Sequence, residues 1–348
     1  MHEDILSKVV QNFAFDFDDV IPERELGGVS LYGIRERPQL FIVDAPEGRR
    51  LATDPSIVGE EFDSLNRTLS RKVWRLIEDM NAVGEDIIFE HVLRAAPGYR
   101  LREAIEERSS FKVTDFYIRP RYIQTSYRQH SHNYVENVFT GELRLKESKS
   151  YTLVKPDTEA TGRSSIAAID AVVEKCRSVG ASIDKVVLYG FISMSGYRRI
   201  LEFANQRKLD VVALAVEDVT ALASNGYDMP VYGVDEGGGS NKGGMVRLAS
   251  MIPEKVLEGI LPEYYPGIDQ PGDWSERQSE LFNGVSVEKG DILSHLNRSL
   301  TRLNALRSIN SGEPWYSQQI DEVYQKNYER LLDSLRNQSG EDMLRQLD

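Results

Sequence analysis

The chain has 348 residues, of which 41% are hydrophobic and 28% charged, and its formal net charge is −13. This length and composition allow a substantial core and exceed what one α/β domain of ordinary size needs, so we expect one core domain with extensions. The acidic balance argues against broad contact with nucleic acid or with an anionic membrane, because both require a basic surface.

Neither the N-terminus nor any internal stretch has the pattern of a targeting or membrane segment. Met1–Asp4 lacks the basic and then apolar pattern of a secretory signal, and the strongly apolar stretch Val186–Met194 is too short to cross a bilayer. We therefore expect a soluble, cytoplasmic protein. The single cysteine, Cys176, falls on the apolar stripe of an expected helix, which favours a buried packing role.

The first part of the chain, residues 1–84, is expected to form a cap on the core. Short apolar runs at Val29–Ile34 and Gln39–Val43 flank the charged turn Arg35–Pro38, which predicts a β-hairpin. Apolar residues at helical spacing then predict an amphipathic helix over Leu65–Met80.

Strand and helix patterns alternate through the middle of the chain, and we assign residues 85–250 to the core domain. This alternation is typical of the α/β class, in which a parallel sheet is joined by crossover helices. The expected strands are Ile87–Leu93, Lys112–Ile118, Ser150–Val154, Lys185–Phe191 and Asp210–Val216. The expected helices are Tyr99–Glu107, Ser164–Val179 and Gly196–Gln206.

The last part of the chain, residues 251–348, is expected to be a mostly helical extension. Its composition shifts to Pro, Tyr, Glu and Leu, and apolar residues recur on one helical face over Gln318–Asn337. Such a stripe indicates either packing on the core or a self-association surface. We expect a homo-oligomer, most simply a homodimer.

The sharpest local feature is the segment Asp157–Ser165, which reads Asp-Thr-Glu-Ala-Thr-Gly-Arg-Ser-Ser between an expected strand and an expected helix. A helix N-terminus presents unpaired N–H groups and a positive dipole end, and Gly162 allows close backbone approach, so a phosphate monoester is the natural ligand. Asp157 would repel a phosphate, so we predict that it accepts hydrogen bonds from ribose hydroxyls or stabilises positive charge on a sugar. The alternative is a simple helix cap.

This segment resembles the ribose-phosphate loop of type I phosphoribosyltransferases. Its surroundings are most similar to the uracil phosphoribosyltransferase branch, whose loop reads Asp-Pro-x-x-Ala-Thr-Gly-Gly-Ser. Three further segments match in chain order. Val92–Gly98 is similar to the pyrophosphate loop Leu-Arg-Ala-Gly, Val186–Gly196 to a strand and an Ala-Pro-Glu-Gly turn, and Asn225–Asp235 to the Gly-Tyr-Ile-x-Pro-Gly-x-Gly-Asp base segment. The resemblance spans roughly residues 85–244.

The resemblance implies a phosphoribosyltransferase-type core and a pentosyltransferase that uses 5-phosphoribosyl pyrophosphate (PRPP), with a small heterocycle as acceptor. Mg²⁺ would be bound mainly through PRPP, with no metal ligand assigned to a side chain. The catalytic residues would be Asp157 near the ribose and, on a mobile lid, Arg119 and Arg121 near the leaving group. Ribose 5-phosphate would be held by Thr158, Glu159, Ala160, Thr161, Gly162, Arg163, Ser164 and Ser165, pyrophosphate by Arg94, Ala95 and Ala96, and the base by Gly226, Tyr227, Met229, Pro230, Gly233 and Asp235.

Several positions depart from the family pattern. Pro156 replaces the first acid of the loop, Arg163 and Ala96 replace glycines, and Val231 follows Pro230 where the family has glycine. These departures leave the acceptor base open and keep two alternatives: a non-catalytic sensor of PRPP or nucleotides, and a phosphate-binding α/β protein of other activity. The basic residues between Arg94 and Arg128 indicate either a small anionic ligand or a solvated helix face.

Overall fold

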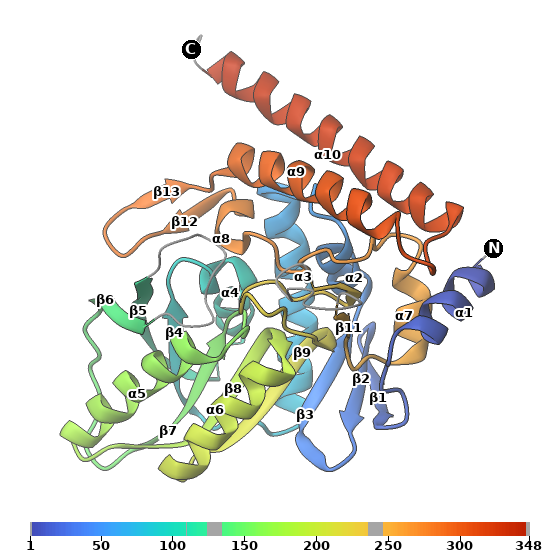
Figure 1. The fold of residues 1–348 in the computed structure, drawn as a ribbon. Helices are drawn as coiled ribbons and strands as arrows, with labels where there is room; N and C mark the ends of the chain where they lie inside the picture. Colours follow the sequence, from blue (N-terminus) through green and yellow to red (C-terminus); the bar gives the residue numbers. More distant parts are fainter. Residues whose placement is uncertain (1, 109, 124–133, 236–245, 346–348) are drawn as a thin grey trace.

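The computed structural model describes residues 2–108, 110–123, 134–235 and 246–345 (Figure 1). Its centre is a nine-stranded sheet in the order β1-β2-β3-β9-β8-β7-β4-β5-β6. The pairs along β3-β9-β8-β7-β4-β5 are parallel, and the pairs at both edges are antiparallel. The predicted α/β class is therefore confirmed. The strands are β1 (Val20–Leu26), β2 (Val29–Ile34), β3 (Arg37–Asp44), β4 (Asp86–Val92), β5 (Lys112–Ile123), β6 (Tyr134–Thr140), β7 (Ser150–Pro156), β8 (Ser182–Ser193) and β9 (Asp210–Thr220).

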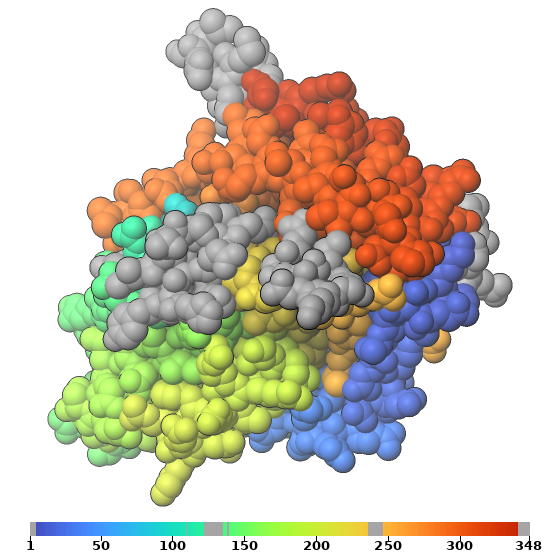
Figure 2. Space-filling view, in the orientation of Figure 1, coloured from blue at the N-terminus to red at the C-terminus, as the bar shows by residue number. Residues whose placement is uncertain are grey.

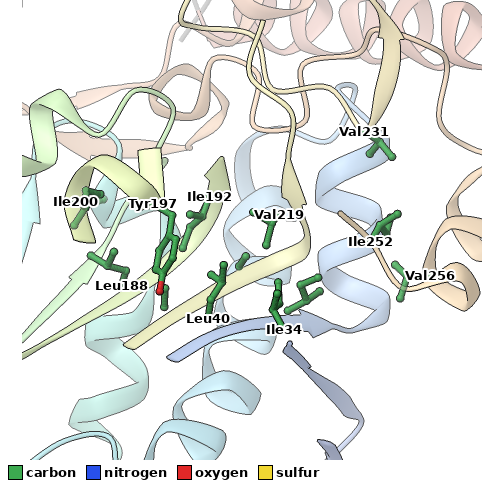
Figure 3. Packing of buried hydrophobic residues seen from close by; sticks show 14 of the residues in the cluster. Ile34, Leu40, Leu188, Ile192, Tyr197, Ile200, Val219, Val231, Ile252 and Val256 are labelled. Atoms are coloured by element: carbon green, nitrogen blue, oxygen red, sulfur yellow. The ribbon is translucent and has the colours of Figure 1, made fainter. Parts of the chain in front are cut away.

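Helices cover both faces of the sheet (Figure 1). One face carries α5 (Arg163–Ser178) and α6 (Met194–Arg207), and the other carries α2 (Pro46–Thr53), α3 (Gly59–Asp79) and α4 (Leu101–Glu106). Figure 3 shows Tyr197 and Ile200 of α6 near Leu188 and Ile192 of β8. Because the central strands are buried on both faces, they read as continuous apolar runs rather than alternating ones.

The N-terminal region joins the main sheet. The hairpin predicted around residues 35–38 is confirmed as the antiparallel pair β2–β3. β3 then pairs in parallel with β9 over Leu40–Val43, so one sheet continues across the boundary expected at residue 84. An apolar strand pattern does not state which strand will be its neighbour, so the sequence alone indicated only a cap.

The predicted core elements are present with modest changes of length. All five expected strands lie within or overlap β4, β5, β7, β8 and β9, and the three expected helices overlap α4, α5 and α6. The strand β6 was not predicted, and it extends the sheet as the antiparallel partner of β5.

The helical C-terminal extension is also confirmed, and it covers one end of the sheet (Figures 1 and 2). It contains α7 (Glu254–Ile260), α8 (Trp274–Arg277), the hairpin β12 (Glu280–Phe282) and β13 (Val287–Lys289), and the helices α9 (Ile292–Asn310) and α10 (Gln318–Arg345). Leu303 and Leu306 of α9 and Tyr324 of α10 are fully buried in the main core. The apolar stripe of α10 therefore packs on the body of the protein, and self-association stays a prediction. None of the described helices is long and apolar enough to cross a membrane.

Candidate functional site

The segment between β7 and α5 is held in place by the end of the neighbouring strand β8. The amide N–H of Asp157 donates to the carbonyl of Tyr189 at 2.9 Å, and that of Glu159 donates to the carbonyl of Phe191 at 2.8 Å. The N–H of Ser193 donates in turn to the carbonyl of Glu159 at 3.0 Å. The loop thus continues the sheet for a few residues before the chain turns into α5.

Residues in the first turns of α6 also hold this loop, by hydrogen bonds to its backbone carbonyls. Ser193 caps α6 by accepting from the N–H of Gly196 at 2.9 Å, and its hydroxyl donates to the carbonyl of Ala160 at 2.5 Å. Arg199 Nη1 donates to the carbonyl of Thr161 at 2.6 Å. The Ser193 contacts come from the segment Val186–Gly196, which resembles the family's strand and Ala-Pro-Glu-Gly turn, and Arg199 lies one turn further along α6. Together they fix the backbone of the loop.

The loop lines a pocket of about 210 Å³ at the N-terminus of α5. Facing it across the pocket are Ala95, Tyr227 and the segment 269–275. The loop residues in the lining are Asp157, Thr158, Glu159, Ala160, Thr161, Gly162, Ser164 and Ser165. A helix N-terminus that opens into a pocket offers backbone N–H groups to an anion, so the geometry suits a phosphate group.

A buried group of charges lies directly beneath the loop. The Lys155 ammonium is fully buried, 2.8 Å from Asp157 Oδ2 and 2.7 Å from Glu159 Oε1. The other oxygen of Glu159 accepts a hydrogen bond from the hydroxyl of Ser165. Both carboxylates belong to residues of the pocket lining, but both oxygens of Glu159 are engaged by Lys155 and Ser165, so Glu159 is a structural acid, whereas Asp157 shares only one oxygen with Lys155.

The residues predicted to bind pyrophosphate lie on the side of the pocket next to the C-terminal hairpin. Ala95 lines the pocket, and Ala96 is buried at the start of the short 3₁₀ helix η1 (Ala96–Tyr99). Arg94 Nη1 lies 2.9 Å from Glu288 Oε1 on β13. Its backbone carbonyl accepts from Gln278 Nε2 at 3.1 Å. The hairpin therefore engages the side chain of Arg94, and Gln278, which follows α8, engages its backbone.

The two arginines expected on a lid lie on β5. Arg119 Nη1 donates to the carbonyl of Asn283 in the hairpin at 3.1 Å. Arg121 is exposed and registered opposite Glu136 of β6. Asn283 Nδ2 also donates to Glu288 Oε2 at 2.9 Å, so Glu288 and Asn283 link Arg94 to Arg119. Arg119 therefore contacts the hairpin, and neither arginine is among the residues of the pocket lining.

The residues predicted to contact the base have different surroundings. Tyr227 lines the pocket, and its hydroxyl donates to Asp273 Oδ1 at 2.9 Å. Asp235 accepts from the backbone and hydroxyl of Ser224 and so closes the loop that leads to Tyr227. The others, which lie outside the described pocket lining, are Gly226, Met229, Pro230 and Gly233, all of them buried.

Sequence reasoning missed the wall of the pocket formed by residues 269–275. Trp274 in this segment stacks on Tyr99, with ring centroids 4.5 Å apart, and makes edge contacts with Phe62 and Phe191. The stretch Asp-Gln-Pro-Gly-Asp-Trp has the composition of a loop. The available signal was a large aromatic residue, Trp274, in a stretch with loop composition. That signal does not reveal which surface the loop covers.

The described residues contain no group of three or more His, Cys, Asp or Glu arranged to hold a metal ion. Asp157 and Asp273 are pocket carboxylates, and both already accept hydrogen bonds from protein groups. The sequence His130-Ser131-His132, which would place two imidazoles on one side of a strand but offers no third metal ligand at suitable spacing, lies outside the described residues.

No protein-family model and no curated protein sequence matches the chain. Three similar solved structures are all phosphoribosyltransferases. The adenine enzyme of Trypanosoma brucei is 16% identical over 57% of this chain and 91% of its own, with a TM-score of 0.36. The adenine enzyme of Leishmania donovani is 14% identical over 60% and 92%, with a TM-score of 0.34. The orotate enzyme of Mycobacterium tuberculosis is 16% identical over 49% and 96%, with a TM-score of 0.29.

Proposed function

We propose that this chain is a phosphoribosyltransferase that transfers ribose 5-phosphate from PRPP to a nucleobase or base-like heterocycle and releases pyrophosphate. One observation carries the proposal: the Asp157–Ser165 loop places the N-terminus of a sixteen-residue helix and a carboxylate on the same pocket. The helix end suits the 5-phosphate, and the carboxylate suits the ribose hydroxyls. The order of motifs described above supports the same ligand.

The phosphate would bind the turn Thr161–Ser165, where backbone N–H groups and hydroxyls meet at the start of α5. The ribose would then lie toward Asp157, whose carboxylate accepts hydrogen bonds from its hydroxyls. Tyr227 and Trp274 are the aromatic side chains that line the pocket, and they would contact the heterocycle.

In the proposed reaction a nitrogen of the heterocycle attacks C1 of the ribose. The bond from C1 to the pyrophosphate oxygen breaks, its electron pair leaves with pyrophosphate, and the proton of the attacking nitrogen passes to pyrophosphate or water. The sugar carries positive charge as the bond breaks, and the Asp157 carboxylate stabilises that charge. Mg²⁺ bound through PRPP would supply positive charge to the leaving group.

A second candidate function is a non-catalytic sensor of PRPP or nucleotides. It is favoured by the contacts of the C-terminal hairpin, since Glu288 and Asn283 already engage Arg94 and Arg119. A protein that binds the donor without turnover has no need to free these arginines for a leaving group.

Mixing the protein with PRPP, Mg²⁺ and a panel of bases separates the two candidates. Release of pyrophosphate that depends on one base supports transfer. Calorimetric binding of PRPP without pyrophosphate release supports the sensor, and absence of PRPP binding removes both. The base panel should include purines and pyrimidines, because the residues predicted to contact the base, such as the buried Met229, do not indicate which heterocycle is the acceptor.

Asp157→Asn and Thr161→Ala are each expected to weaken PRPP binding by about tenfold to a hundredfold. The first removes the carboxylate proposed for the ribose and the second a hydroxyl proposed for the phosphate, and hydrogen bonds to charged groups contribute about 1.5–3 kcal/mol. Isothermal titration calorimetry measures the change. The matched control is Asp184→Asn, an exposed acid on β8, and its affinity should equal that of the wild type. Unchanged affinity in both site variants would remove the assignment.

Glu288→Gln is expected to raise the affinity for pyrophosphate by roughly twofold to fivefold. The substitution removes the carboxylate that neutralises Arg94, and exposed ion pairs contribute about 0.2–1 kcal/mol. Glu280→Gln changes the same charge on the same hairpin without touching Arg94, so it serves as the control. The gain should shrink as salt concentration rises. Equal affinities for the two variants would mean that Arg94 does not contact pyrophosphate.

A further inference from the structure

We propose that Lys155 is a positioning residue of this site, which holds the Asp157 side chain in one orientation and maintains it as a carboxylate facing the pocket. The role that this gives Asp157 toward ribose rests on the proposed function. The contact between Lys155 and Asp157 stands on the geometry alone.

Lys155, Asp157 and Glu159 alternate along an extended chain, so their side chains point to the same side. A fourth group, Glu90, comes from the neighbouring strand, because Phe89 of β4 is registered with Val154 of β7. All four side chains are buried. One ammonium group thus lies among three carboxyl groups, and a lysine is found in such a place only when acids compensate its charge.

Two hydrogen bonds fix the orientation of Asp157. Its Oδ2 accepts from Lys155 Nζ at 2.8 Å, and its Oδ1 accepts from the N–H of Thr158 at 2.8 Å. Rotation of the side chain would break both bonds at once. Each carboxylate oxygen has a second lone pair, so the residue can still accept from a ligand in the pocket.

The neighbours of Asp157 act on its ionisation in opposite directions. Burial raises the pKa of Asp157 to about 6, the Lys155 charge lowers it, and the Glu159 charge raises it. Burial also raises the pKa of Glu90 to about 8, so Glu90 is mostly protonated at neutral pH. Burial raises the pKa of Tyr99 well above its ordinary value, so its phenol, which contacts Thr158, stays neutral. Lys155 and Glu159 are therefore the charges that decide the state of Asp157.

The test follows the titration of Asp157 directly by carboxyl ¹³C NMR in the ligand-free protein, with Asp157→Asn to assign the signal. Lys155→Met should raise the titration midpoint by about 1–3 pH units, because an opposite charge at this distance has that effect. Lys155→Arg should restore most of the shift. Glu159→Gln should move the midpoint in the other direction, to lower pH. Glu90→Gln, which removes a group already neutral below pH 7, should leave it unchanged.

The same variants are then compared for binding of ribose 5-phosphate as a function of pH. Binding should be lost as Asp157 is protonated, so each midpoint should follow the NMR value, to higher pH in Lys155→Met and to lower pH in Glu159→Gln. Should Lys155→Met fail to fold, the downward shift in Glu159→Gln and the behaviour of Lys155→Arg still decide the question. An Asp157 midpoint that is the same in Lys155→Met as in the wild type, or the same in Glu159→Gln as in the wild type, overturns the proposal.

Failure of the proposed function has a different signature. If the NMR midpoints shift as expected but ribose 5-phosphate and PRPP do not bind at any pH, Lys155 positions Asp157 and the ligand assignment is wrong. If both ligands bind with a pH dependence that the variants do not alter, the ligand assignment stands and the role of Lys155 is refuted.

Discussion

Gly162→Ala is expected to destabilise the folded protein by about 2–5 kcal/mol and to abolish binding of ribose 5-phosphate. Gly162 has φ of +71°, a conformation that L side chains rarely adopt. A Cβ atom there would lie 2.7 Å from the carbonyl oxygen of Gly196, and this neighbour is backbone of α6 that cannot rotate away. The loop would have to move off α6, and the N–H groups at the start of α5 would move with it.

The chain offers a matched control for this substitution. Gly180 has φ of +69°, but no atom lies within 4 Å of a Cβ built on it. Gly180→Ala should therefore cost only the backbone strain, about 1–2 kcal/mol, and leave binding unchanged. Urea unfolding measures both costs, and calorimetry measures binding. Equal losses of stability would show that contact with Gly196 is unimportant.

The centre of the fold was predictable because its signals are local. Continuous apolar runs such as Val186–Phe191 indicate strands buried on both faces, and the spacing of apolar residues in 164–179 indicates a helix on the sheet. The glycine at position 162 could also be interpreted from the sequence, because glycine allows close approach of the backbone at the turn before a helix. The structure adds that Gly162 has a left-handed backbone. These features depend only on residues adjacent in sequence.

The remaining parts of the site depend on contacts between distant segments. Lys155 would ordinarily be placed at the surface, and its burial is compensated by acids in the loop after its own strand and on β4. The hairpin residue Glu288 meets Arg94 across nearly two hundred residues of chain. The spacing of apolar residues along the sequence does not predict contacts between such distant residues. The contact between Glu288 and Arg94 follows from packing of the C-terminal extension on the end of the sheet, and the sequence predicted that extension only as helical.

Arg277 joins the C-terminal extension to the N-terminal helices, and Arg277→Met is expected to cost about 3–5 kcal/mol. The side chain is fully buried and donates to the carbonyls of Leu51, Asp54, Ile57 and Pro271 at 3.0–3.3 Å. Burial lowers its pKa to about 10, so it remains charged at neutral pH. Methionine fills similar space but removes the guanidinium donor from all four carbonyls, of which Asp54 keeps the N–H of Ile57, and unsatisfied buried groups account for most of the expected loss.

The control for this prediction is Arg336→Met, which removes an exposed arginine paired with Asp333 on α10 and should change stability by less than about 0.5 kcal/mol. Because Arg277 ends the short helix α8 that Trp274 begins, and its guanidinium lies over the Trp274 ring, its loss should also loosen the pocket wall and weaken ribose 5-phosphate binding. A single cooperative urea transition shifted to lower concentration would mean that the extension and the sheet unfold together. Separate transitions, with binding retained, would mean that residues 251–348 form an independent unit and that the wall is dispensable.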